Sequence, residues 1–166
     1  PKELYRVSKK GTVPVLITSD NLVIDESLEI MLWALENNPK QQWLKDSYSQ
    51  DLDIISNNDT EFKKWLDRYK YHDRFPDQSK IYYREACCEI LDIYENKLIN
   101  SQYILKNSIG LVDIAVFPFI RQFSNVDQDW FNDYYNKLPS WLEKISSSEL
   151  FTKVMKKNEL WVEKEI

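Results

Sequence analysis

The first forty residues combine two short β-rich runs with one helical stripe. Runs rich in Val, Leu and Ile near 13–17 and 21–24 flank a Thr-Ser-Asp-Asn turn, a pattern typical of a β-hairpin. Apolar residues then recur at helical spacing, which predicts a helix over about 27–37. Pro39 should end it, because proline lacks a backbone N–H and disfavours helical geometry in the preceding residue. These elements form a strand-strand-helix unit.

Beyond residue 40 the apolar positions follow a helical period only. Two long stripes predict core helices near 79–99 and 112–123. Thr60 is expected to cap an earlier helix over 60–73, and Ser140 a later one. Shorter helices are expected near 130–134, 141–145 and 148–157.

The change of pattern near residue 40 predicts two structural units. The first, 1–38, cannot be a domain alone, because an isolated hairpin with one helix is marginally stable in water. Either preceding chain completes it or it docks on the helices, and the Val- and Ile-rich strands favour preceding chain. A linker over 39–46 should lead to an all-α domain over 47–166. The expected fold class is α/β plus all-α.

Charge and composition exclude several kinds of partner. The chain has 166 residues, 22 basic and 27 acidic, a net charge of −5, which argues against binding nucleic acid. No apolar run approaches the ~20 residues of a membrane span, and no signal-peptide pattern opens the chain, so we expect a cytoplasmic protein without membrane contact. Two glycines cannot make a Gly-rich phosphate loop, which excludes nucleotide cofactors of that kind.

The cysteines and the histidine do not suggest a catalytic or metal site. Cys87 and Cys88 are adjacent, so they cannot supply spaced zinc ligands, and we expect them to be buried in a helix rather than to act as a vicinal redox pair. His72 is the single histidine, so no Cys-His or Ser-His-Asp arrangement can be built. We therefore assign no metal and no catalytic residue within this chain.

Two segments together carry a family resemblance. Gly-Thr-Val-Pro-Val-Leu around Val13 and Pro14, followed by Val-Ile-Asp-Glu-Ser-Leu around Glu26 and Ser27, resembles the glutathione-binding half of a glutathione transferase. The resemblance implies a cis bond before Pro14, so that the backbone of Val13 can pair with the cysteinyl part of glutathione as an added strand would. Ser27 at a helix N-terminus suits the γ-glutamyl carboxylate and Glu26 the ammonium group, while Asp25 is expected to be a spectator.

The resemblance continues through the rest of the chain. Asn-Pro at 38–39 resembles the family's interdomain linker, and Leu-Pro-Ser-Trp-Leu at 138–142 its late helical signature. The segment 109–114 resembles the capping box of the central helix, although Gly110 offers no side-chain acceptor. Asp113 can still reach back to the Gly110 N–H, and Ser108 is an alternative cap.

The family's catalytic residue is absent. A glutathione transferase opens with a strand, a helix and a strand that carry it, and Pro1 aligns after all three. The chain looks most like bacterial cysteine-type (omega-like) members, which implies a Cys upstream of Pro1 and an inactive isolated piece. The implied function is detoxification by conjugating glutathione to small electrophiles or reducing mixed glutathione disulfides, with glutathione as substrate. The alternative is a non-catalytic interaction module that keeps the fold as a scaffold.

Two further expectations follow from the resemblance. The family builds its second-substrate pocket from the first bundle helices and the central one, and here we expect Trp65, Arg68, Tyr69 and Arg121 in those positions. Core packing or plain surface remains the alternative for each. Family members form homodimers, with Tyr82, Tyr83 and Trp65 as expected anchors.

Overall fold

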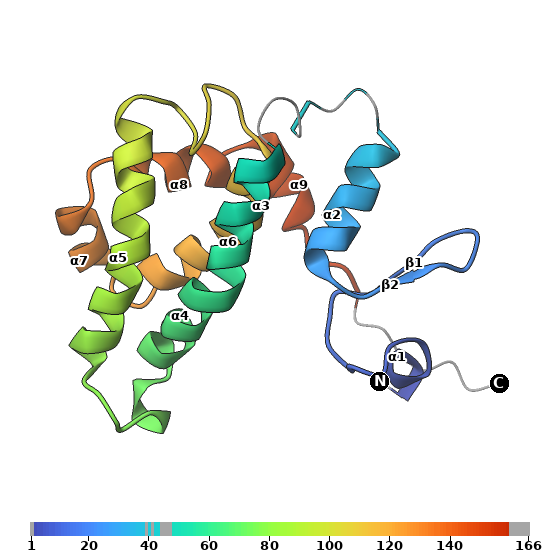
Figure 1. Ribbon diagram of the computed structural model, residues 1–166, viewed down its shortest axis with the longest axis horizontal. Helices are drawn as coiled ribbons and strands as arrows, with labels where there is room; N and C mark the ends of the chain where they lie inside the picture. Colours follow the sequence, from blue (N-terminus) through green and yellow to red (C-terminus); the bar gives the residue numbers. More distant parts are fainter. Residues whose placement is uncertain (1, 39, 41, 44–47, 160–166) are drawn as a thin grey trace.

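A small hairpin unit stands beside a larger helical part in the computed structural model, which describes residues 2–38, 40, 42, 43 and 48–159 (Figure 1). No helix within these ranges is long and apolar enough to cross a membrane. The elements are α1 Lys2–Val7, β1 Leu16–Ile17, β2 Val23–Ile24, α2 Ser27–Glu36, α3 Tyr48–Asn57, the π-helix Asn58–Phe62, α4 Lys63–Lys70, the 3-10 turn His72–Arg74, α5 Lys80–Ile99, α6 Leu111–Ser124, α7 Gln128–Tyr134, α8 Leu138–Ser146 and α9 Glu149–Val154.

The hairpin unit has the predicted strand-strand-helix order. β1 and β2 pair antiparallel, with Leu16 opposite Ile24, but each strand has two residues and is shorter than predicted. Thr18 closes the turn: its N–H donates to the Leu22 carbonyl at 2.9 Å, and its hydroxyl accepts from the Leu22 N–H at 3.0 Å. The backbone bond between Thr18 and Leu22 continues the register of the two strands as far as the turn.

A helix at the start of the chain was not predicted. α1 has six residues, none of them buried, so no apolar stripe marks it. It ends where the Ser8 N–H donates to the Leu4 carbonyl at 2.8 Å, and Ser8 is itself buried. The fold class is otherwise as expected, an incomplete thioredoxin-like unit followed by a helical bundle. Of the predicted linker, 40, 42 and 43 are described and the rest lies outside the described residues, so its boundaries stay a prediction.

The prediction that Thr60 caps a helix over 60–73 is wrong. α3, the π-helix and α4 follow one another without a break from Tyr48 to Lys70. Thr60 sits inside this run, and its hydroxyl donates to the Ser56 carbonyl at 2.9 Å. A threonine hydroxyl can bond the carbonyl four residues earlier as readily as it can cap, so the residue type did not distinguish the two.

The core lies between α3–α4, α5 and α6, as the apolar stripes predict. The stripe of α5 is buried along its whole length, and Phe62 and Phe123 close the core between α4 and α6, their ring centroids 6.2 Å apart. Cys87 and Cys88 are buried in α5, as predicted, and burial raises the pKa of both thiols. The buried members of the α5 stripe are Tyr83, Cys87, Cys88, Ile90, Leu91, Tyr94 and Leu98.

The N-terminus of α6 is closed by one buried carboxylate. Gly110 is the N-cap, and its N–H donates to Asp113 Oδ2 at 3.0 Å, which confirms the predicted one-sided capping box and excludes Ser108 as the cap. Asp113 Oδ1 accepts two more hydrogen bonds, from the Ile104 N–H at 3.0 Å and from Trp141 Nε1 at 2.9 Å. One side chain therefore joins the loop before α6, α6 itself and α8.

Ser140 does not cap its helix, which corrects a second prediction. α8 begins at Leu138, so Ser140 lies within its first turn. The N–H groups at this end donate instead to the carboxylate of Glu95 on α5. Pro139 fits the first turn because its missing N–H would have no partner there.

Candidate functional site

The N-terminus of α2 presents an open anion-binding position. Glu26 precedes the helix in extended geometry, and its carbonyl accepts from the Ile30 N–H at 3.0 Å. No side chain of the described chain caps this end, and the hydroxyl of Ser27 has no hydrogen-bond partner there. The first N–H groups of a helix carry a partial positive charge, so an exposed, uncapped end of this kind favours a carboxylate.

Val13 lies at the same end of the hairpin. β1 begins three residues after Val13 and β2 ends three residues before Ser27, so in this antiparallel pair both residues lie beyond the same end of the sheet. The bond between Val13 and Pro14 is cis, and Val13 is 79% exposed. Its backbone N–H and C=O bond to no other described part of the chain. An extended peptide can therefore pair with Val13 while its end group reaches Ser27.

Lys10 joins this site, in a place beside Glu26 that the sequence did not assign to it. Lys10 Nζ lies 3.0 Å from Asp25 Oδ1 and also contacts Glu26 Oε1. Ser8 Oγ donates to Asp25 Oδ2 at 2.7 Å. Hydrogen bonds from Ser8 and Lys10 hold the pKa of Asp25 below its usual range, and the bonds to Glu26 and Asp25 raise the pKa of Lys10. Asp25 is therefore no spectator, because it anchors Lys10 beside Glu26.

The local signal for Lys10 was the glycine that follows it. Gly11 has φ +64°, and a Cβ added there would lie 2.2 Å from the ring of Tyr5. The left-handed turn folds the chain tightly against α1 and leaves Lys10 next to the hairpin. A lysine directly before a glycine that the turn requires was therefore the sequence feature from which its position near the hairpin could have been predicted.

The four residues expected at a second-substrate pocket do not come together. Tyr69 is 1% exposed, and its ring packs 5.1 Å from that of Phe123, so it belongs to the core. Arg68 lies over the rings of Trp65 and Phe75, on the α4–α5 side. Arg121 lines two hollows that have no described residue of α4 in their walls. The apolar period of α4 places Tyr69 in the core, whereas Trp65 packs against Tyr82 and Tyr83 of α5, so neither ring lines these hollows.

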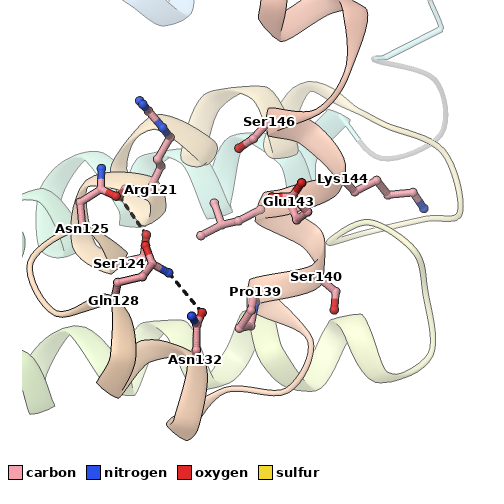
Figure 2. A pocket seen from close by; sticks show the side chains of 11 residues that line it. Arg121, Ser124, Asn125, Gln128, Asn132, Pro139, Ser140, Glu143, Lys144 and Ser146 are labelled. Atoms are coloured by element: carbon pink, nitrogen blue, oxygen red, sulfur yellow. Dashed lines mark hydrogen bonds between the residues drawn. The ribbon is translucent and has the colours of Figure 1, made fainter.

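The larger of these hollows is lined mostly by polar residues and measures about 910 Å³ (Figure 2). Its walls come from α6 with α7 and from α8, and the Gln128 amide donates to Asn132 Oδ1 at 3.1 Å. The smaller, of about 340 Å³, lies between α6 and α9 and is mostly apolar, with the guanidinium of Arg121 5.4 Å from the Phe151 ring centroid. Neither has a cysteine or histidine among its described lining residues, so neither offers a thiol or an imidazole. Within the described ranges no group of three or more His, Cys, Asp or Glu could hold a metal ion.

Comparison with known proteins identifies the helical part. Residues 58–149 match the family described as "Glutathione S-transferase, C-terminal domain". The chain belongs to this family. The match begins at the π-helix and ends at the start of α9, so it covers the helices from α4 to α8 and the core between them. It does not include Val13, Glu26 or Ser27, whose roles stay a prediction.

Solved glutathione transferases share the fold of this family member over nearly its whole length. Glutathione transferase URE2P6 from Phanerochaete chrysosporium, solved with oxidized glutathione, superimposes with a TM-score of 0.79 at 14% identity, covering 93% of this chain and 76% of its own. BphK, a bacterial GST, gives 0.78 at 17% identity, covering 93% and 78%. Glutathione transferase F7 from Populus trichocarpa gives 0.74 at 18%, also covering 93% and 78%. A search of curated proteins found no match. At such identities the likeness establishes the fold.

Proposed function

We propose that this chain supplies the glutathione-binding surface and helical domain of a cytoplasmic, cysteine-type glutathione transferase, most like the bacterial omega-like members. The observation that carries the proposal is the uncapped N-terminus of α2, with Ser27 and Glu26 exposed, beyond the same end of the sheet as the unpaired backbone of Val13. The N-terminus of α2 suits the carboxylate of the γ-glutamyl end of glutathione, and Glu26 suits its ammonium group. The free backbone of Val13 suits the cysteine, which follows next in the ligand. URE2P6 from Phanerochaete chrysosporium, which shares the fold, binds oxidized glutathione.

Each group has a distinct task in this proposal. The helix N–H groups and the Ser27 hydroxyl donate to the γ-glutamyl carboxylate, and Glu26 accepts from the ammonium group. The backbone of Val13, whose N–H and C=O bond to no other described part of the chain, pairs with the cysteinyl segment. The site thereby binds and orients glutathione.

The nucleophile in this proposal lies outside the 166 residues. Both thiols of the chain are buried in α5, and burial raises their pKa, so neither provides a thiolate at neutral pH. A cysteine before Pro1 would activate bound glutathione for attack on a small electrophile, or take part in exchange with a mixed disulfide. Of the residues expected to meet that second substrate, Arg121 alone is placed at hollows of the described chain that could receive one.

Replacing Ser27 by Ala should weaken glutathione binding by about tenfold or more, because a hydrogen bond to a charged group contributes roughly 1.5–3 kcal/mol. Titration calorimetry of the chain with reduced glutathione measures this. The matched control is Ser49→Ala, an exposed serine in α3 away from α2. Equal affinities in all three proteins would contradict the assigned role of Ser27. No binding by the unsubstituted chain, folded by circular dichroism, would favour the non-catalytic scaffold.

We also propose a homodimer that uses the α4–α5 surface. Ile81 and Tyr82 are 56% and 46% exposed, and Trp65 packs edge-on against Tyr82 with ring centroids 6.3 Å apart. Tyr83, expected as an anchor, is 2% exposed and donates its hydroxyl to the Phe75 carbonyl at 3.0 Å, so it supports the surface from within.

Replacing Ile81 by Glu should shift the protein from dimer to monomer in sedimentation velocity, because an unpaired charge would be buried in the centre of the interface. Ile93→Glu is the control, since Ile93 is similarly exposed (50%) on the same helix but lies three helical turns beyond Tyr82, about 16 Å along the helix axis. A monomeric unsubstituted protein, or dimers of equal strength in both variants, would place the interface elsewhere.

A further inference from the structure

Three charged groups form one cluster at the entrance to α2. The ammonium of Lys10 bridges Asp25 and Glu26, contacting one oxygen of each. The two carboxylates differ in their surroundings: the Asp25 side chain is 26% exposed, and the Glu26 side chain is 58% exposed. Asp25 is also fixed on its second oxygen by Ser8 Oγ at 2.7 Å. Lys10 therefore has one well-anchored partner and one freely accessible partner.

Glu26 is the group that the proposed function assigns to the ammonium of glutathione. The ammonium of Lys10 has the same charge and the same three donors as the ligand's amino group. Both compete for Glu26, because Lys10 Nζ already contacts one of its oxygens and blocks part of the carboxylate. When a ligand takes Glu26, Lys10 keeps its bond to Asp25, so no charge is left unpaired.

We propose, on the basis of the proposed function, that Lys10 is an internal competitor for the ammonium position: it occupies Glu26 in the free protein and is exchanged for the ligand's ammonium on binding. The exchange replaces one ion pair by another. The amino group of glutathione then adds little to the affinity of the unsubstituted protein. A ligand that resembles the γ-glutamyl group but lacks a free amino group is therefore disfavoured less than it would be at a site without Lys10. Lys10 thus sets how strictly the site requires the amino group.

A double comparison of protein and ligand tests the exchange. The ligands are glutathione and glutaryl-Cys-Gly, which differs from glutathione in lacking the amino group. Their ratio of dissociation constants measures the preference for that group. In Lys10→Gln the preference should rise about threefold, the size expected of one exposed ion pair. In Glu26→Gln it should fall close to one. Lys9→Gln, an exposed neighbour that contacts neither carboxylate, should leave the ratio unchanged.

The bridge itself can be followed without a ligand. Carbon-13 NMR titration of the Asp25 carboxyl group in the free protein should give a higher pKa in Lys10→Gln than in the unsubstituted protein, because Lys10 lowers that pKa in the structure. An unchanged Asp25 pKa overturns the bridge. A ligand ratio that stays the same or falls in Lys10→Gln, with glutathione still bound, overturns the exchange and leaves the proposed function standing. Failure of both ligands to bind the unsubstituted protein overturns the proposed function and the exchange with it.

Discussion

Replacing Asp113 by Ala should lower the free energy of unfolding by about 4 kcal/mol. Asp113 is 1% exposed, and its carboxylate accepts from the Gly110 N–H, the Ile104 N–H and Trp141 Nε1. A buried donor left without an acceptor costs roughly 1–3 kcal/mol, and three such costs in one place do not add fully. For a chain of this size we expect the midpoint of thermal unfolding to fall by about 10 °C.

Asp113→Asn separates the two halves of this network. An asparagine can keep its oxygen at the Oδ1 position and still accept from Ile104 and Trp141, but its amide group then faces the donor of Gly110. The loss should be about half that of the alanine variant. Asp129→Ala, at an exposed position in the first turn of α7, should change stability by less than ~0.5 kcal/mol. Urea unfolding ranks the three variants, and a loss below ~1 kcal/mol for Asp113→Ala would show that the network does not stabilise α6.

The long helices were predictable because their apolar periods are long and regular. The stripes of α5 and α6 run through several turns, and burial alone imposes that spacing. The contact between Asp113 and Gly110 was predictable for a different reason, since both residues lie within one helical turn. The bonds from Ile104 and Trp141 to the same carboxylate were not, because they depend on how α6 meets a loop and α8.

The two failed caps have a common cause. Thr60 and Ser140 are of a residue type that caps helices, and in isolation each precedes an apolar stripe. At Thr60 the preceding helix continues through a π-turn, which shifts the phase of the pattern by one residue and imitates a new start. At Ser140 the cap comes from another helix. Both outcomes are decided by tertiary contacts that a local pattern does not contain.

In the candidate site, too, the residues defined by a local segment were predicted, and the contact that depends on tertiary structure was not. Glu26 and Ser27 were assigned to the site because their segment resembles the glutathione-binding half of a glutathione transferase, and the pattern of a β-run followed by a helical stripe correctly placed them at the start of α2. The place of Lys10 beside Asp25 and Glu26 was not predicted, since these partners follow it by 15 and 16 residues and the contact depends on how the segment before the hairpin folds back. Tyr69 was proposed at a pocket because aromatic type does not reveal which face of a helix is buried.

Replacing Glu95 by Ala should lower the free energy of unfolding by about 2 kcal/mol, through loss of the cap that α5 provides to α8. Glu95 Oε1 accepts from the N–H groups of Asn136 at 2.9 Å and Lys137 at 2.8 Å, and Oε2 from that of Leu138 at 2.8 Å. Loss of a capping side chain costs about 0.5–2 kcal/mol, and a charged acceptor at a helix N-terminus puts this one at the upper end.

Glu95→Gln retains one carbonyl oxygen at the Oε1 position and loses the charge, so its loss should be about half that of Glu95→Ala. The control is Glu89→Ala, an exposed glutamate on the same helix that makes no contact with α8, for which less than ~0.5 kcal/mol is expected. Hydrogen exchange adds a local measurement. The amide of Leu138 should exchange faster in Glu95→Ala than in the unsubstituted protein, although the variant remains folded. Equal exchange rates of Leu138 in the Glu95 and Glu89 variants would contradict the assigned role of Glu95. The N-terminus of α8 would then be held by the packing of Trp141 and Leu142.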